Sequence, residues 1–200
     1  MPRPGTARPG GRTARTRAAV RDATLAELAD HGYDGLTVEA VAARAGVHKT
    51  TVYRRWESVE GLVVDALDLA SGEPWPVPDT GELRADLRAL TREVLVGFTD
   101  PAAGPAATAF VVAAARNAAT AAAMHDYLVA RHEQAAPIVT RAVDRGELPT
   151  GTDPGDVVRT AVAPLYYRLF VSREPVDAAD AERAADAALA AARAGTFVRG

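Results

Sequence analysis

A short basic stretch, residues 49–55, carries the side chains with the clearest chemistry in this chain. Its cations can bind phosphate or read guanine bidentately, its hydroxyls can hold phosphate oxygens, and threonine methyl groups can contact thymine. At helical spacing, Val52 and Trp56 would face inward with Val47, which leaves an outer face without an acid that suits the major groove of DNA. The members of that face are Lys49, Thr50, Thr51, Tyr53, Arg54 and Arg55.

Two short helices are predicted to hold this face in place. Thr37 is a favourable N-cap for a helix over residues 38–45, Glu39 suits its positive end, and Gly46 ends it. The basic helix over residues 49–56 begins after only two more residues, so the pair has the spacing of a helix-turn-helix. Free amides at the start of the earlier helix also favour a phosphate beside Thr37.

Charge is distributed unevenly along the chain. The formal net charge is −3, but residues 1–57 carry 10 Lys and Arg against 6 Asp and Glu, a net of +4, whereas residues 58–200 carry −7. Residues 1–12 are rich in Pro, Gly and Arg and are predicted to form a flexible basic arm. Arg12 and Arg15 would then reach the DNA backbone or a minor groove.

A solvated helix with ordinary surface charges is the competing interpretation of residues 49–56. Taken alone, this helix supports the two interpretations about equally, because short basic helices are common. The glycine turn, the apolar stripe of the preceding helix, the acid-free face and the basic arm together favour DNA binding.

Composition favours an all-α protein. Ala accounts for 45 of the 200 residues, and alanine forms helices well but fills a core poorly. Cys is absent, which excludes disulfides, cysteine zinc sites and thiol nucleophiles. We expect a helix-turn-helix domain over residues 13–57 and a ligand-binding and dimerisation domain over residues 58–200. About nine helices are expected, near residues 13–31, 38–45, 49–56, 58–71, 81–99, 105–119, 121–146, 154–173 and 177–194.

Residues 31–67, HGYDGLTVEAVAARAGVHKTTVYRRWESVEGLVVDAL, resemble the DNA-binding domain of TetR-type transcriptional regulators. Residues 145–189 resemble the C-terminal part of one subgroup of that family, less strongly but in the same order along the chain. The matching positions of the first segment are Gly32-Tyr33, Thr37-Val38, Val41-Ala42, Ala45-Gly46-Val47, Thr51-Val52-Tyr53, Trp56 and Leu62.

The resemblance implies a ligand-responsive transcriptional regulator, most simply a repressor. It would bind a palindromic double-stranded DNA operator as a homodimer and be released by a small-molecule effector. Tyr53 would contact a phosphate, Thr37 would do so from the preceding helix, and residues 48–54 would line the groove. His48 stands where the family often has Ser or Thr, and Val59 stands where many members have a phosphate-contacting Lys. The first departure makes His48 a weaker helix cap and a candidate phosphate or base contact, and the second removes one phosphate contact that the family often makes.

The two last helices are expected to form the dimer interface, as two helices from each subunit. The alternative is that both cover the core of a single chain. Pro164 lies within the earlier helix and should kink it, because proline lacks an N–H and crowds the carbonyl four residues back. The expected interface residues are Val158, Val162, Leu165, Leu169, Ala181, Ala185, Ala188 and Leu189.

Large apolar residues outside the core pattern suggest a ligand pocket, with a few polar partners. Each residue taken singly is as well explained as part of the core. The alanine-rich stretch 102–123 would leave volume beside them. The candidate ligand-binding residues are Trp75, Phe98, Phe110, Arg116, Asn117, Met124, His125, Tyr127 and Tyr166.

Other function classes have little support. The pair His132-Glu133 lacks the second histidine of a zinc protease motif, and phosphate-binding, dinucleotide-binding and nucleophile motifs are absent, so we expect no enzyme, cofactor or metal. No apolar run approaches a membrane span, which makes the cytoplasm the default location. The alternatives are a helical small-molecule-binding protein or enzyme that binds no operator, or a basic end that meets a membrane surface or acidic partner. The hydroxyl-rich outer face of residues 49–55 argues against a membrane.

Overall fold

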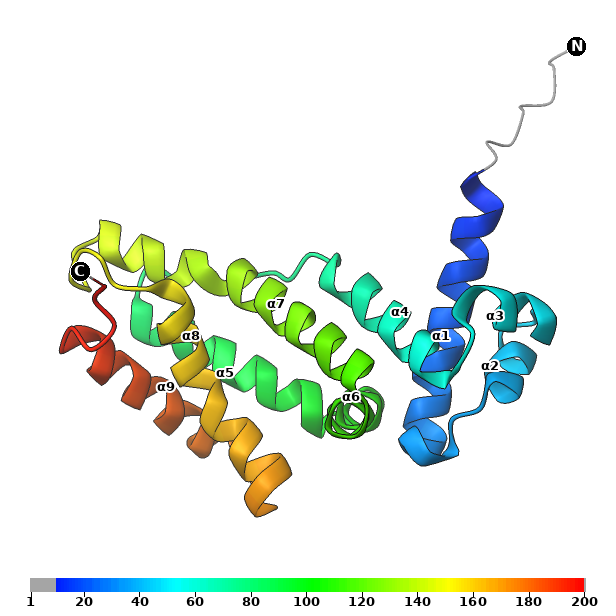
Figure 1. Ribbon diagram of the computed structural model, residues 1–200. Helices are drawn as coiled ribbons and strands as arrows, with labels where there is room; N and C mark the ends of the chain where they lie inside the picture. The colour runs from blue at the N-terminus through cyan, green and yellow to red at the C-terminus, as the bar shows by residue number, and fades with distance from the viewer. Residues whose placement is uncertain (1–9, 200) are drawn as a thin grey trace, which may run out of the picture. The chain divides into compact units, whose positions relative to one another are not determined.

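The computed structural model describes residues 10–199 as a series of α-helices joined by short connections (Figure 1). The prediction of an all-α chain is confirmed: in that range, β-type pairing is limited to an isolated bridge between Thr152 and Val198. In chain order the helices are α1 Gly10–Gly35, α2 Val38–Arg44, α3 Lys49–Trp56, α4 Val59–Ser71, α5 Leu83–Thr99, α6 Gly104–Arg116, α7 Ala118–Asp144, α8 Pro154–Tyr166, the π-helix η1 Tyr167–Ser172, and α9 Ala178–Arg193.

Helix α1 is longer than the sequence predicted at both ends. It begins at Gly10, within the predicted flexible arm 1–12, of which residues 1–9 lie outside the described part of the chain. Gly32 has φ 67° and ψ −176°, so the regular helix breaks where a terminal glycine was expected. One further helical turn follows and ends at Gly35.

The helices form two compact units. The first comprises residues up to Ala70 together with Pro105–His125, and the second comprises Ser71–Gly104 and the residues from Asp126 onward. The boundary expected after residue 57 therefore differs from the observed grouping. Helix α4 belongs with the helix-turn-helix, and part of the expected second domain joins it.

Ion pairs join the helices of the first unit. The Arg17 guanidinium on α1 lies 2.7 Å from a carboxylate oxygen of Asp65 on α4. The buried carboxylate of Glu27 on α1 lies 2.7 Å from Nε of Arg44 at the end of α2, and Arg44 also pairs with Asp30 at 2.6 Å. A buried carboxylate requires such a partner, so the Glu27–Arg44 pair sets how α2 sits on α1.

The core of the second unit lies between α5, the C-terminal half of α7, α8 and α9 (Figure 1). Leu87 and Leu90 of α5, Val158 of α8, and Ala185 and Leu189 of α9 are almost completely buried in one cluster. The buried alanines of α9 allow close contact between helices, as their small side chains predicted.

Pro164 precedes a change of helix type. The α-helical hydrogen bonds of α8 continue to Tyr166 and then widen into the π-helix η1, Tyr167–Ser172. The N–H of Tyr167 bonds the carbonyls of both Ala163 and Pro164. Proline cannot donate the bond that the carbonyl four residues back would accept, so its direct effect falls on the turn before Pro164, whereas the wider turn begins three residues after it.

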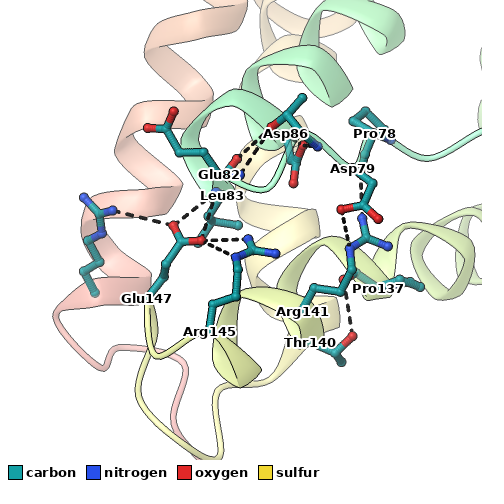
Figure 2. Close-up of polar contacts among 12 residues, drawn as sticks. Pro78, Asp79, Glu82, Leu83, Asp86, Pro137, Thr140, Arg141, Arg145 and Glu147 are labelled. Atoms are coloured by element: carbon teal, nitrogen blue, oxygen red, sulfur yellow. Dashed lines mark hydrogen bonds and ion pairs between the residues drawn. The ribbon is translucent and has the colours of Figure 1, made fainter.

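A polar cluster closes the N-terminal end of α5 (Figure 2). Glu82 occupies the N-cap position without a side-chain capping bond. Glu147, 64 residues away in the chain, accepts a 3.1 Å hydrogen bond from the Leu83 N–H and pairs with Arg145 at 2.7 Å. Beside it, Arg141 donates to the Pro78 carbonyl at 2.6 Å. The start of α5 is thus capped by the turn that follows α7.

Candidate nucleic-acid interface

The helix-turn-helix follows the geometry expected from its caps and its glycine. Thr37 accepts a 3.1 Å hydrogen bond from the Ala40 N–H and caps α2. Gly46 has φ 64°, a conformation that favours glycine, and reverses the chain between the two helices. The next N–H, of Val47, bonds the Ala42 carbonyl at 3.0 Å. This tight turn places α3 directly after α2.

Helix α3 is anchored by its apolar side and presents its polar side outward. Val52 is fully buried and Trp56 is 6% exposed, as predicted. The Arg55 guanidinium lies 5.0 Å from the ring centroid of Trp56, which restrains this cation on the surface. Thr51 is half-buried and so contributes less to the outer face than expected. The exposed members of that face are Lys49, Thr50, Tyr53, Arg54 and Arg55.

His48 is a working N-cap for α3. Its Nδ1 lies 2.8 Å from the Thr50 hydroxyl oxygen and 3.4 Å from the Thr50 main-chain nitrogen, whose N–H it accepts. The second distance is long for a hydrogen bond. The imidazole therefore holds the start of the helix through the Thr50 hydroxyl as well as through the Thr50 main-chain N–H. His48 is exposed, and its Nδ1 is occupied within the protein.

An acid that the sequence did not place on this surface lies beside Tyr53. The Tyr53 hydroxyl donates a 2.9 Å hydrogen bond to Oε1 of Glu39, from the first turn of α2. That bond is the main reason why the pKa of Glu39 is lowered and the pKa of Tyr53 is raised, and the charge of Lys49 lowers the Glu39 pKa further. The outer face of α3 itself is free of acids, but α2 supplies a carboxylate to it.

The predicted basic arm is only partly described. Arg15 is exposed on α1, and its Nε donates to the Gly11 carbonyl at 3.1 Å. The side chain of Arg12 lies outside the described residues, although its main chain belongs to α1. Arg15 therefore lies on the first helix, where the sequence predicted it.

The residues predicted for the dimer interface lie mostly inside one chain. Seven of the eight are buried, each no more than 7% exposed, and Leu169 is half-buried. They pack against the other helices of the second unit, so this part of the prediction is corrected: these side chains fill the core of a single subunit. The seven are Val158, Val162, Leu165, Ala181, Ala185, Ala188 and Leu189.

Aromatic members of the predicted ligand site meet in the second unit. The Phe98 and Tyr166 rings lie edge to face with centroids 5.2 Å apart, and Phe170 lies 5.1 Å from Phe98. Burial raises the pKa of Tyr166 to about 12. Phe170 was not among the predicted residues, although it lies one helical turn from Tyr166.

A second aromatic group surrounds an arginine. The guanidinium of Arg131 lies 5.6 Å from the Trp75 ring centroid and 5.2 Å from that of Tyr127. The indole N–H of Trp75 donates to Glu93. Trp75 and Tyr127 were predicted as ligand contacts, whereas Arg131, which joins them, was not.

The remaining predicted ligand residues belong to the first unit, where two have structural partners. Asn117 caps α7 by accepting the Ala119 N–H at 2.8 Å, and Arg116 pairs with Asp34. The side-chain oxygen of Asn117 is thus committed to the helix start. Of the others, His125 is exposed, while Phe110 and Met124 are half-buried.

The described residues, 10–199, offer neither a metal-binding cluster nor a straight membrane-spanning helix. No group of three or more His, Asp or Glu side chains there could hold a metal ion. No single helix there is long and apolar enough to span a membrane, and α5 and α6 reach that length and composition only together, with a bend of 88° between them.

Comparisons with known proteins agree along most of the chain. Residues 20–66 match the model of "Bacterial regulatory proteins, tetR family", and residues 77–188 match that of "Tetracyclin repressor-like, C-terminal domain". The regulator AqdR of Rhodococcus erythropolis is 35% identical over 149 residues, which are 74% of this chain and 72% of AqdR. The HTH-type regulator Rv1556 of Mycobacterium tuberculosis is 33% identical over 152 residues, 76% of this chain and 75% of Rv1556.

Solved structures give the same result for the fold. The TetR family transcription regulator SCO0332 superposes with a TM-score of 0.70 at 32% identity, over 88% of this chain and 97% of SCO0332. The SmeT–triclosan complex superposes with a TM-score of 0.59 at 24% identity, over 92% of this chain and 95% of that one.

Proposed function

The chain belongs to the TetR family of bacterial regulatory proteins, and we propose that it is a repressor that binds a palindromic operator as a homodimer. Its family identifies it as a DNA-binding transcriptional regulator and not as an enzyme. The observation that carries the proposed binding mode is the acid-free exposed face of α3, which follows a capped α2 and a glycine turn. Like other bacterial regulators, it would act in the cytoplasm.

We assign the recognition of the DNA sequence to α3. Arg54 is exposed and can read guanine bidentately, while Lys49 and Tyr53 can hold phosphates on either side. In a dimer, the two copies of α3 would enter successive major grooves about 34 Å apart. Thr37 and Arg15 would contribute from α2 and α1.

The dimer face is assigned to the exposed side of α8 and η1. Tyr167 is 58% exposed and Val171 is 68% exposed in the single chain. Ala163 and Pro164 are exposed one turn before Tyr167. This apolar stripe is on the solvent side of the helix whose other side fills the core, so a second copy can cover it.

A small-molecule effector is proposed to control DNA binding. One structural neighbour, SmeT, was solved as a complex with triclosan, which is a property of that protein. In this chain, the Phe98–Tyr166–Phe170 group and the Trp75–Arg131–Tyr127 group are the aromatic surfaces that such a ligand would meet. An effector that binds the DNA-incompetent arrangement more tightly would weaken operator binding by that difference in affinity.

The operator can be found and the binding mode tested together. We would select duplexes from a random library with the wild-type chain and then measure affinities for the selected sequence. Arg54→Ala should weaken binding about tenfold or more, and Tyr53→Phe should weaken it less. Arg84→Ala is the control, because Arg84 is exposed on α5 and shares its partner Asp186 with Arg88. Unchanged affinity in both α3 variants would contradict the assignment of α3 to the groove.

The effector can be sought independently of DNA. A thermal-shift screen of apolar and cationic small molecules should find compounds that raise the melting temperature. A true effector must also change the affinity for the selected duplex. A compound that stabilises the chain without changing DNA affinity would not be the regulator's ligand.

A further inference from the structure

The Glu39–Tyr53 hydrogen bond joins the two helices of the helix-turn-helix on their exposed side. The Tyr53 hydroxyl lies 2.9 Å from Oε1 of Glu39, and both residues are exposed. Glu39 belongs to the first turn of α2, and its charge interacts with that of Lys49 on α3. A carboxylate therefore lies among the groups that are assigned to phosphate and base contacts.

Tyr53 cannot serve both acceptors at once. A phenol has one proton to donate, and an ionised carboxylate and a phosphate oxygen can only accept. If the Tyr53 hydroxyl donates to a phosphate, its hydrogen bond to Glu39 must break. The Glu39 carboxylate then lies near the phosphate and has one hydrogen bond fewer. This exchange opposes binding to any duplex, whatever its sequence.

We infer that Glu39 is a specificity-determining residue, which weakens sequence-independent DNA binding and reads an exocyclic amino group at its own position. The inference rests on the proposed function. Amino groups are the hydrogen-bond donors of the major groove, and a carboxylate pairs most often with N4 of cytosine. On a duplex that supplies this donor, Glu39 recovers the hydrogen bond that it loses when Tyr53 turns to phosphate. On other duplexes it does not.

The first test measures sequence-independent affinity on a random-sequence duplex. Glu39→Gln removes the charge and should tighten binding about fivefold at low salt, with a smaller gain as salt is raised. Glu133→Gln is the matched control: Glu133 is exposed on α7 in the second unit, and its substitution changes the net charge equally. An equal gain in both variants, or no gain at Glu39, would overturn the inference.

The second test measures the coupling between the two residues. In the Glu39→Ala background, the Tyr53 hydroxyl has lost its competing acceptor and is available to phosphate throughout. Tyr53→Phe should therefore weaken random-duplex binding more in that background than in the wild type. Additive effects of the two substitutions would show that the Tyr53 hydroxyl does not switch its hydrogen bond from Glu39 to a phosphate, and would overturn the inference.

The third test asks what Glu39 reads. Selection from a random library with the Glu39→Ala chain should lose the preference for cytosine at one position of each half-site and leave the other positions unchanged. A selected sequence identical to that of the wild type would overturn the inference while leaving the proposed function intact. A wild-type chain that selects no duplex would instead overturn the proposed function.

Discussion

Gly61, in the first turn of α4, lies directly against the main-chain carbonyl of Trp56 at the end of α3. A Cβ built at residue 61 would overlap that carbonyl oxygen. Neither partner is a flexible side-chain end, so the contact can be relieved only by moving α4 away from α3. The close approach of α3 and α4 therefore depends on the absence of a Cβ atom at residue 61.

Gly61→Ala should therefore destabilise the first unit, despite the better helix propensity of alanine. We expect a loss of at least about 2 kcal/mol, typical of overpacking that displaces backbone. Gly97→Ala is the control, because a Cβ at this exposed position on α5 meets no atom within 4 Å. It should be stabilising by about 0.5 to 1 kcal/mol. Urea unfolding followed by circular dichroism measures both, and equal responses would contradict the packing argument.

Glu147→Ala should weaken the start of α5 by about 1 kcal/mol, the usual contribution of a helix cap. The Leu83 N–H would lose the acceptor that Glu147 supplies from the turn after α7 (Figure 2). Glu82→Ala is the comparison, since Glu82 holds the N-cap position but makes no side-chain capping bond. Thermal unfolding should separate the variants. If Glu82→Ala costs more than Glu147→Ala, the cap has been assigned to the wrong residue.

The N-terminus of α9 should be sensitive to acid. Asp180 and Asp177 cap each other's main-chain N–H groups, and that capping, with Arg183 and Arg168, lowers the Asp180 pKa from 3.8 to about 2. A carboxyl group whose pKa is lower in the folded state stabilises the fold at pH values above its ordinary pKa. That stabilisation is lost as the pH falls from about 3.8 towards 2. The free energy of unfolding of Asp180→Asn should thus lie below that of the wild type at pH 6 and approach it near pH 2. A difference that stays constant over this range would contradict the linkage.

Tyr167→Asp should produce a monomer. An ionised carboxylate on the exposed stripe of α8 and η1 would be buried without a partner in the proposed dimer, but stays in water in one chain. Sedimentation at micromolar concentration should report about 20.9 kDa for this variant and twice that for the wild type. Val129→Asp, on an exposed valine of α7, is the control and should remain dimeric. If Tyr167→Asp stays dimeric, the interface lies elsewhere.

Helix boundaries were predictable because their signals act over a few residues. Thr37 caps α2 through the Ala40 N–H three residues on, and Gly32 and Gly46 take positive φ where the sequence predicted breaks. The start of α1 is the exception. Gly10 and Gly11 are poor helix formers by type, yet they continue the helix to which they are attached.

The side chains predicted for the dimer face lie in the core because the segment of α8 and η1 is apolar on two sides. Val158, Val162 and Leu165 form one apolar stripe along the helix, and they are the side chains that α5 and α9 cover within one chain. The other side carries Ala163 and Pro164 and continues on η1 with Tyr167 and Val171, and periodicity alone does not tell which side a neighbouring helix covers. That choice depends on the arrangement of helices distant in the sequence.

The acid beside the outer face of α3 was missed for a related reason. Glu39 was interpreted as a favourable charge at the start of α2, and nothing in its spacing from Tyr53, 14 residues on, indicates a contact. The turn at Gly46 brings the two together. A sequence pattern indicates which face of one helix a residue occupies. Which residues of two helices meet depends also on the angle at which the helices cross, and the pattern does not give that angle.

Lys49 is the single lysine of the sequence, and it is exposed at the first position of α3. An amine-directed acylating reagent consequently has one side-chain target in each chain, on the helix assigned to the groove. The α-amino group is the other amine that the reagent would label. Once its label is subtracted, the mass added to the intact protein would give the fraction of chains in which Lys49 is accessible, that is, in which α3 is not covered by DNA. If α3 enters the groove as proposed, Lys49 is a natural footprinting probe for bound DNA.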